Sequence, residues 1–467
     1  MTRSTRRLRL LILAAVAAPL ATASAGPRGG EPRTPLDAYV HAEDPAYGWK
    51  VLHRVPRPRH TELIVELTSQ QWRDAAEVSR TEWRHTLSIV VPAGAASDAA
   101  LLLVTGGAND RAPPDRASHR LRQAAHATGS VVAELSCVPN QPLRVLTSSR
   151  PEKPRKEDDL LAASWVECIE TEDPTWLAQL PMAKSAVAAM TAVQEAVARV
   201  DGAPSIERFT VAGASKRGWT AWLAAAVDDR VAAVAPIVID VLNIAPSMKH
   251  HLASYGRWSR ALQDYERQGL ADRLDDPESA AIRAIVDPYV YRERLTMPKC
   301  LINASGDEFF LPDSSRFYFD DLVGEKHLSY APNAGHALRG SDALDTLVAF
   351  HASIAHGLER PTLSWDSAYD APVHTVRCSA EPTEATLWRA VNPSARDFRL
   401  PVIGEAFQPT PLEPQPDGSY RVPISAPERG FSATFARFSF DIGASKPFRV
   451  STPVWVSPDV EPFAGKE

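Results

Sequence analysis

The chain has 467 residues, of which 44% are hydrophobic and 23% charged, a composition typical of globular proteins with one or two domains. Its formal net charge is −6 at pH 7, and removing the four arginines of residues 1–25 gives −10, which argues against nucleic acid as a partner. Beyond residue 25, no segment has the length and apolarity of a transmembrane span.

Residues 1–25 have the pattern of a signal peptide. A basic start precedes the apolar run 10–20, and the small residues Ala23, Ser24 and Ala25 offer a cleavage site. We therefore expect an exported protein, periplasmic or secreted, whose mature chain begins near Gly26. Residues 26–58 show no sustained periodicity and are predicted to form an irregular arm.

Residues 59–360 alternate between predicted strands and helices. Alternating polarity predicts strands at 62–68 and 86–91, and the continuous apolar run 99–104 indicates a strand buried on both faces. Further strands are predicted at 131–135, 209–212, 231–239, 299–304 and 328–331, and helices at 114–128, 181–200, 217–226 and 341–354. This order predicts a mainly parallel sheet with helices on both faces, and the helical interval 243–298 is predicted to be a cap over its C-terminal edge.

The pattern changes near Arg360 and Pro361. Short alternating runs separated by Pro, Gly and Asp turns predict an all-β sandwich over residues 361–460, of the immunoglobulin or fibronectin III type, followed by a tail at 461–467. The sandwich is a candidate surface for contact with a polysaccharide or a protein.

The four cysteines do not have the Cys-x-x-Cys spacing of a zinc or redox site; they are Cys137, Cys168, Cys300 and Cys378. An oxidising compartment permits disulfides, but their connectivity does not follow from the sequence. Cys300 opens an apolar run, so we expect a buried free thiol there.

Ser215 is the candidate nucleophile. It lies in the run GASKRG (213–218), between the strand at 209–212 and the helix at 217–226. A nucleophile elbow needs this setting, because small neighbours allow the sharp strand-to-helix turn that exposes the serine oxygen. The turn places the backbone N–H of Lys216 at a helix N-terminus, where it can hold an oxyanion, and Gly107 or Ala108 is expected to supply the second donor.

His336 is the candidate general base, because imidazole exchanges protons near neutral pH and PNAGH (332–336) forms a loop late in the chain. A carboxylate should orient it. Asp307 is preferred, while Glu308 and Asp240 are alternatives. The chain order of serine, acid and histidine is that of α/β-hydrolases. Lys216 or Arg217 could attract an anionic substrate group, although an ion-paired role is equally compatible. Most other histidines, including His250 and His251 in the cap, are expected at the surface.

Seven motifs between residues 36 and 460 resemble those of the PhoPQ-activated pathogenicity-related protein family, which includes the autocrine proliferation repressor proteins. They are TSQQW (68–72), VPNQP (138–142), GASKRGW (213–219), VDPY (286–289), SGDEFFLP (305–312), PNAGH (332–336) and WRAVNPSARDFR (388–399). The resemblance implies an α/β-hydrolase domain with a C-terminal β-sandwich and no settled substrate. Cys137 departs from the polar residue expected there and leaves a disulfide with Cys168 open.

These features predict an exported serine hydrolase that transfers the acyl group of an ester or amide to water, with a small molecule or a peptide as substrate. The alternative is a non-catalytic secreted signalling or binding protein on a hydrolase scaffold. No zinc signature, phosphate loop or dinucleotide fingerprint occurs, so neither a cofactor nor a metal is expected.

Overall fold

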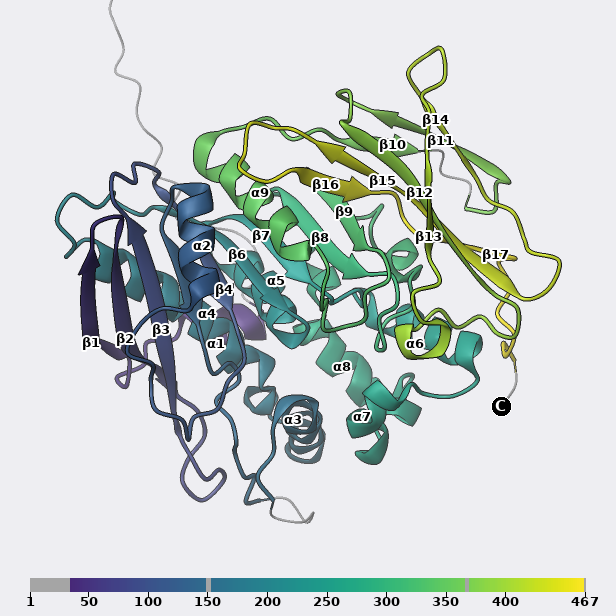
Figure 1. Ribbon diagram of the computed structural model, residues 1–467. Helices are drawn as coiled ribbons and strands as arrows, with labels where there is room; N and C mark the ends of the chain where they lie inside the picture. The colour runs from purple at the N-terminus through teal and green to yellow at the C-terminus, as the bar shows by residue number, and fades with distance from the viewer. Residues whose placement is uncertain (1–33, 148–152, 366–368, 466–467) are drawn as a thin grey trace, which may run out of the picture. The chain divides into compact units, whose positions relative to one another are not determined.

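A large mixed β-sheet organises the chain (Figure 1). The computed structural model describes residues 34–147, 153–365 and 369–465, and the predicted leader lies outside them. The first nine strands lie side by side in the order β1 (Gly48–Arg57), β2 (His60–Gln71), β3 (Glu82–Pro92), β5 (Val132–Leu135), β4 (Ala99–Val104), β6 (Arg208–Ala214), β7 (Val231–Ile237), β8 (Lys299–Ala304) and β9 (Lys326–Ala331).

The strands from β5 to β9 are parallel, whereas β1, β2 and β3 are joined to one another and to β5 in antiparallel pairs. Because parallel strands end at the same edge of a sheet, the loops after β4, β6, β8 and β9 gather there. The predicted strand at 99–104 is β4, and all of it except Leu103 is buried. This order and the helical layers described next define an α/β-hydrolase fold.

Helices cover both faces of the sheet (Figure 1). On one face lie α1 (Pro35–His41), α4 (Gln179–Val197) and α5 (Lys216–Val227), and on the other lie α2 (His119–Thr128) and α9 (Ala343–His356). Successive residues of β4 point to opposite faces of the sheet. Leu102 packs in the hydrophobic cluster that includes residues of α4 and α5, and Leu101 packs in the cluster that includes residues of α2 and α9. Because β4 is covered on both faces, its sequence is a continuous apolar run.

The prediction of an irregular arm at residues 26–58 is wrong for the described part of that segment. It forms α1, capped by Thr34, and the edge strand β1. Strand β1 pairs along its length with β2, but its outer side faces solvent and many of its side chains are exposed. Strand β1 is held by its backbone pairing with β2 and has no buried apolar face, so its sequence shows no regular alternation of polar and apolar residues.

The interval between β7 and β8 is helical, as predicted for a cap. It contains α6 (Ile244–Tyr255), η2 (Arg260–Leu262), α7 (Gln263–Arg267), η3 (Ala271–Arg273), α8 (Pro277–Val286) and η4 (Pro288–Tyr291). Asp287 ties the two ends of this insertion together, because its carboxylate accepts the backbone N–H groups of Ile244 at 2.8 Å and Tyr289 at 3.0 Å. Burial raises the pKa of Asp287 to about 6.

The C-terminal β region contains two sheets. One consists of β10 (Leu363–Trp365), β11 (Val373–Cys378) and β14 (Tyr420–Pro423), and the other of β12 (Glu384–Asn392), β13 (Gln408–Pro411), β15 (Phe431–Phe440), β16 (Phe448–Ser451) and β17 (Trp455–Ser457). They pack face to face, with the rings of His374 and Trp455 stacked at 4.1 Å. Ser451 of β16 pairs with Leu328 of β9, so the second sheet continues the hydrolase sheet.

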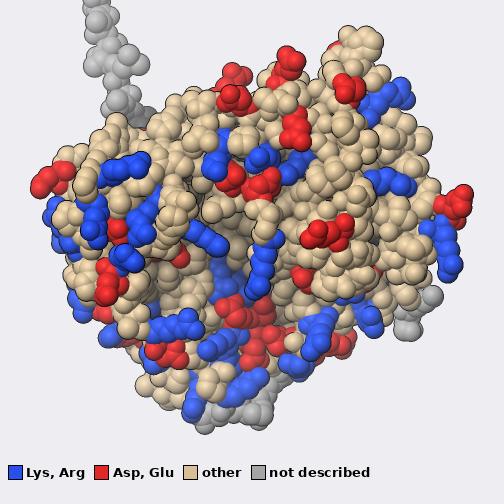
Figure 2. All heavy atoms as spheres, in the orientation of Figure 1, with Lys and Arg blue, Asp and Glu red and all other residues tan. Residues whose placement is uncertain are grey.

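The described part of the predicted tail, residues 461–465, contacts helix α6. The backbone N–H of Phe463 donates to Ala253 O of α6 at 2.8 Å, and Glu461 contacts His250. Acidic and basic side chains are interspersed on the face of the molecule shown in Figure 2. Among the described residues, no helix is long and apolar enough to cross a bilayer.

Candidate active site

Ser215 lies in a strained turn between β6 and α5. Its backbone has φ 58° and ψ −129°, a conformation that side chains other than glycine rarely adopt. The Ser215 N–H donates to Ile237 O of β7 at 2.7 Å, and its carbonyl accepts the N–H of Trp219 at 3.0 Å. These bonds hold the turn at the carboxyl edge of the sheet with the side chain partly exposed.

Two glycines make the turn sterically feasible. A Cβ atom on Gly213 would lie 2.4 Å from Arg217 O, and one on Gly218 would lie 2.7 Å from Gly213 O. Both neighbours are backbone atoms, so a side chain at either position requires α5 to move away from β6. The spacing Gly-x-Ser-x-x-Gly is one residue longer at its end than the common Gly-x-Ser-x-Gly elbow, and it places Gly218 where the helix packs on the strand.

Replacing Gly213 by Ala is expected to lower the free energy of unfolding by about 1–3 kcal/mol, because the added methyl overlaps the backbone of α5. Gly48→Ala is the matched control: its Cβ meets no atom within 4 Å, and its effect is expected within about 0.5 kcal/mol. Urea denaturation measures both values. Equal stability of the two variants would contradict the packing argument.

His336 is oriented by Asp307. Its Nδ1 lies 2.9 and 3.0 Å from the two carboxylate oxygens of Asp307, and Asp307 also accepts the backbone N–H of Phe309 at 2.7 Å. Glu308 has a different place: its Oε2 accepts the backbone N–H of His336 at 2.6 Å and so holds the loop, not the ring. Asp307 follows β8 and His336 follows β9, which brings the two loops together.

Asp240 does not contact His336. Its carboxylate is buried and accepts hydrogen bonds from the hydroxyls of Tyr318 and Tyr330, the latter at 2.5 Å. Burial and, to a smaller extent, the negative charge of Asp307 raise the pKa of Asp240 to about 7. Of the three carboxylates considered from the sequence, only Asp307 reaches the imidazole.

No hydrogen bond links Ser215 Oγ to His336 within the described residues. The two are connected through Phe309 and Phe310, which line the same pocket as Ser215 and whose rings lie 4.2 and 6.0 Å from the imidazole. Catalytic hydrogen bonds in unliganded hydrolases are often long and tighten when substrate binds.

The loop after β4 adjoins the Ser215 turn, since Val104 pairs with Gly213 in the sheet. Gly107 has φ 148°, and a Cβ there would lie 3.1 Å from the backbone nitrogen of Cys137. Within the described residues, no protein acceptor is recorded for the N–H groups of Lys216, Gly107 and Ala108. A disulfide between Cys137 and Cys168 does not form, because both are buried free thiols. Cys300 is likewise a buried free thiol, as predicted.

The two cations beside Ser215 are neutralised by acidic residues. Lys216 Nζ lies 2.9 Å from Glu157 and 3.1 Å from Asp158, and Arg217 makes two bonds to Glu157 at 2.6 and 2.7 Å. These cations hold the pKa of Glu157 well below its usual value. Neither cation is therefore available to attract an anionic substrate group.

Both acidic residues come from α3 (Glu157–Thr171), a helix that the sequence reasoning missed. The run Glu157, Asp158 and Asp159 fills its first turn, a pattern that favours a helix N-terminus because of the helix dipole. Glu157 also binds Gln141, through its side chain at 2.6 Å and its backbone at 2.7 Å. Glu157 of α3 therefore contacts both Gln141 of the VPNQP motif and Arg217 of the GASKRG motif.

An apolar pocket with a cavity volume of about 100 Å³ lies beside Ser215. It is lined by residues of the cap, of α3, of the start of α5 and of the loops after β7 and β8. Its lining residues are Asp158, Trp165, Ser215, Lys216, Trp219, Ile239, Val241, Ile244, Met248, Trp258, Leu262, Tyr265, Leu270, Ala271, Leu274, Phe309 and Phe310. Its mostly apolar lining is typical of a small-molecule site.

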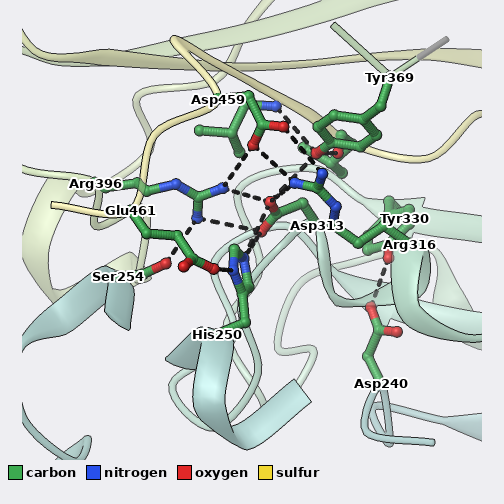
Figure 3. A network of polar contacts seen from close by, with 12 residues as sticks. Asp240, His250, Ser254, Asp313, Arg316, Tyr330, Tyr369, Arg396, Asp459 and Glu461 are labelled. Carbon is green, nitrogen blue, oxygen red and sulfur yellow. Dashed lines mark hydrogen bonds and ion pairs between the residues drawn. The ribbon is translucent and has the colours of Figure 1, made fainter. Parts of the chain in front are cut away.

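Figure 3 shows a network of charged and polar side chains around Asp313, which lies six residues after Asp307 in the segment that follows β8. Asp313, fully buried, lies 2.5 Å from Arg396 of the C-terminal β region and 3.2 Å from His250 of the cap. His250 and His251 are themselves buried, so the prediction that they lie at the surface is wrong. His250 pairs with the carboxylates of Asp313 and Glu461, and this pairing offsets the cost of burying its ring.

The chain belongs to the PhoPQ-activated pathogenicity-related protein family, whose model matches residues 36–399. Autocrine proliferation repressor protein A of Dictyostelium discoideum is 37% identical over 458 residues, with 92% of each chain covered.

Among solved structures, similarity extends to acetyl xylan esterase 1 from a Thermoanaerobacterium species, with a TM-score of 0.45, 14% identity, and 68% of this chain and 93% of that chain covered. The glucuronoyl esterase from Solibacter usitatus has a TM-score of 0.41 and 16% identity, with 68% and 88% covered. Acylaminoacyl peptidase from Pyrococcus horikoshii also has a TM-score of 0.41, with 11% identity and 68% and 51% covered.

Proposed function

We propose that this protein is an exported serine hydrolase that cleaves an ester or amide. The observation that carries the proposal is the pairing of His336 with Asp307 next to a pocket that Ser215 lines from a strained turn. Export rests on the basic and apolar pattern of residues 1–25. We further infer that residues 59–360 form the hydrolase unit and residues 361–460 a β-sandwich attached to it.

In this proposal Ser215 Oγ attacks the carbonyl carbon of the substrate while His336 takes the hydroxyl proton. Asp307 keeps the imidazole in the tautomer whose Nε2 can accept that proton. The N–H groups of Lys216 and of Gly107 or Ala108 hold the oxyanion of the tetrahedral intermediate. His336 then gives the proton to the leaving alcohol or amine, and a water molecule regenerates Ser215 by the reverse steps.

A fluorophosphonate probe tests the enzyme directly. Wild-type protein is expected to become covalently labelled, and Ser215→Ala is expected to abolish the label because the attacking oxygen is gone. Intact-mass measurement detects the adduct, and a thermal melt checks that the variant is folded. A folded wild type that stays unlabelled would overturn the proposal. Comparing short acyl esters with aminopeptide substrates then separates an esterase from a peptidase.

The alternative is a non-catalytic signalling or binding protein, which the name of the Dictyostelium relative, a proliferation repressor, supports. In that case the C-terminal β region is the proposed contact surface for a protein or polysaccharide. The same labelling experiment decides between the two, since a binding protein has no need for a reactive serine.

A further inference from the structure

We propose that the pocket beside Ser215 binds the apolar acyl group of a carboxylic ester. This inference rests on the proposed hydrolase function and adds the class of substrate to it. Three features of the pocket carry it: the chemistry of its walls, the cancellation of its charges, and its position relative to the reacting atoms.

Three aromatic side chains that line the pocket have their polar atoms already hydrogen-bonded within the protein. The indole N–H of Trp165 donates to Gln179 at 3.2 Å, and that of Trp219 donates to Val286 O at 2.5 Å. The hydroxyl of Tyr265 donates to Asp158 at 3.2 Å. These three side chains therefore offer no free donor to a ligand, which favours an alkyl or aryl group over a sugar.

The charged groups of the pocket cancel one another. Lys216 is 6% exposed, and its ammonium lies within 3.1 Å of both Glu157 and Asp158. A substrate anion placed here would have to displace these carboxylates, and a cation would have to displace Lys216. The pocket therefore selects a neutral group.

The position of the pocket joins it to the reaction. Ser215 lies in its wall, and Phe309 and Phe310 extend the wall from Ser215 to the ring of His336. The cap residues Met248, Leu270 and Ala271 also line the pocket. An acyl chain bonded to the reacting carbonyl would enter this space directly.

The reaction on such an ester balances without any other reactant than water. Ser215 Oγ forms a bond to the acyl carbon, the bond from that carbon to the ester oxygen breaks, and the serine proton passes through His336 to the alcohol. Water then attacks the acyl-enzyme, releases the apolar carboxylic acid and returns the proton to Ser215.

Binding without catalysis is tested first. Ser215→Ala is titrated with methyl octanoate and with methyl acetate while tryptophan fluorescence is followed, because Trp165, Trp219 and Trp258 line the pocket. A saturable change with the octanoate ester that the acetate ester does not produce is expected. Equal responses to the two esters, or none to either, would overturn the inference.

Kinetics test the same point in the wild type. With p-nitrophenyl esters, kcat/KM is expected to rise about fourfold per methylene from acetate until the pocket is filled, which is the ratio that burial of one methylene supplies. Alkyl acetates of increasing alcohol length are the second arm. A dependence on alcohol length without a dependence on acyl length would overturn the assignment of the pocket to the acyl group.

A matched pair of variants locates the effect. Ala271→Trp fills the cap wall of the pocket and is expected to lower the octanoate-to-acetate ratio of kcat/KM at least tenfold. Ala280→Trp adds the same side chain to the exposed side of α8, outside the pocket, and is expected to leave the ratio unchanged. An unchanged ratio in Ala271→Trp would overturn the inference.

The two proposals fail in different ways. If the fluorophosphonate probe labels Ser215 but neither binding nor turnover depends on acyl length, the acyl pocket is wrong and the hydrolase stands. If the probe leaves Ser215 unlabelled while Ser215→Ala and wild type both bind methyl octanoate, the hydrolase is wrong and the pocket is a site for apolar ligands.

Discussion

Replacing Asp307 by Asn is expected to lower kcat by about 10³–10⁴-fold while the fold is retained. The carboxylate accepts the N–H at Nδ1 of His336, with both oxygens within 3.0 Å. An amide that turns its NH₂ toward Nδ1 favours the opposite tautomer, in which Nε2 carries the proton and cannot accept one from Ser215. Steady-state kinetics with a p-nitrophenyl ester measure the loss, which should lie in kcat.

Glu308→Gln is the matched control for Asp307→Asn. The glutamine keeps a side-chain oxygen that can accept the backbone N–H of His336, so the loop stays in place and kcat is expected to fall by less than about tenfold. A larger loss in Glu308→Gln than in Asp307→Asn would show that the acid had been misassigned. Circular dichroism and thermal melts of both variants exclude a general loss of structure.

Replacing Asp313 by Ala is expected to destabilise the protein by about 3–5 kcal/mol, the cost of leaving buried charges without a partner. The change removes the buried counterion of Arg396, which is 1% exposed, and one of the two carboxylates that pair with His250, which is 2% exposed (Figure 3). Because Arg396 belongs to the C-terminal β region and His250 to the cap, both should loosen together. Urea denaturation at pH 7 measures the effect.

The pH of that measurement matters. Apart from the opposing effect of burial, the charges of Arg396 and His250 hold the pKa of Asp313 well below its usual range. A carboxyl whose folded pKa is lowered contributes stability that is present above its unfolded pKa and is lost as the pH falls through the folded pKa. The difference between wild type and Asp313→Ala is therefore expected to be full at pH 7 and to shrink under acid.

Asp459→Ala is the control for Asp313→Ala. Asp459 pairs with Arg316 at 2.8 Å, but its side chain is 28% exposed, so water can replace the lost partner. Its expected cost is about 1 kcal/mol or less. If the two substitutions had similar effects, burial would not be what makes Asp313 important.

Local patterns were sufficient to predict most of the hydrolase sheet. The strands at 99–104 and 299–304 have the predicted bounds, since each is an apolar run between turn residues. The helical cap and the change to short strands after residue 360 were also visible, because period and composition change there. Strand β1 and helix α3 were missed. Strand β1 is held by backbone pairing at the edge of the sheet. Helix α3 is buried on more than one side, so its sequence has no simple amphipathic pattern.

In the candidate site, too, some residues could be predicted from local sequence and others could not. Ser215 and His336 stand in short motifs whose neighbours are small residues, and the structure puts both loops at the carboxyl edge of the sheet. Nothing local separates Asp307 from Glu308, which are adjacent and equally acidic. Only the direction of each side chain relative to the histidine loop assigns one to the ring and the other to the backbone.

By itself, the sequence determined the order of the elements, the family, and the two loops that carry the serine and the histidine. These follow from periodicity, glycine placement and motifs, which act over a few neighbouring residues. Only the tertiary structure decided which carboxylate meets the imidazole, how the cations beside Ser215 are neutralised, and how apolar the pocket is. Each of these depends on residues far apart in the chain, whose distances and burial are set by the packing of the whole fold.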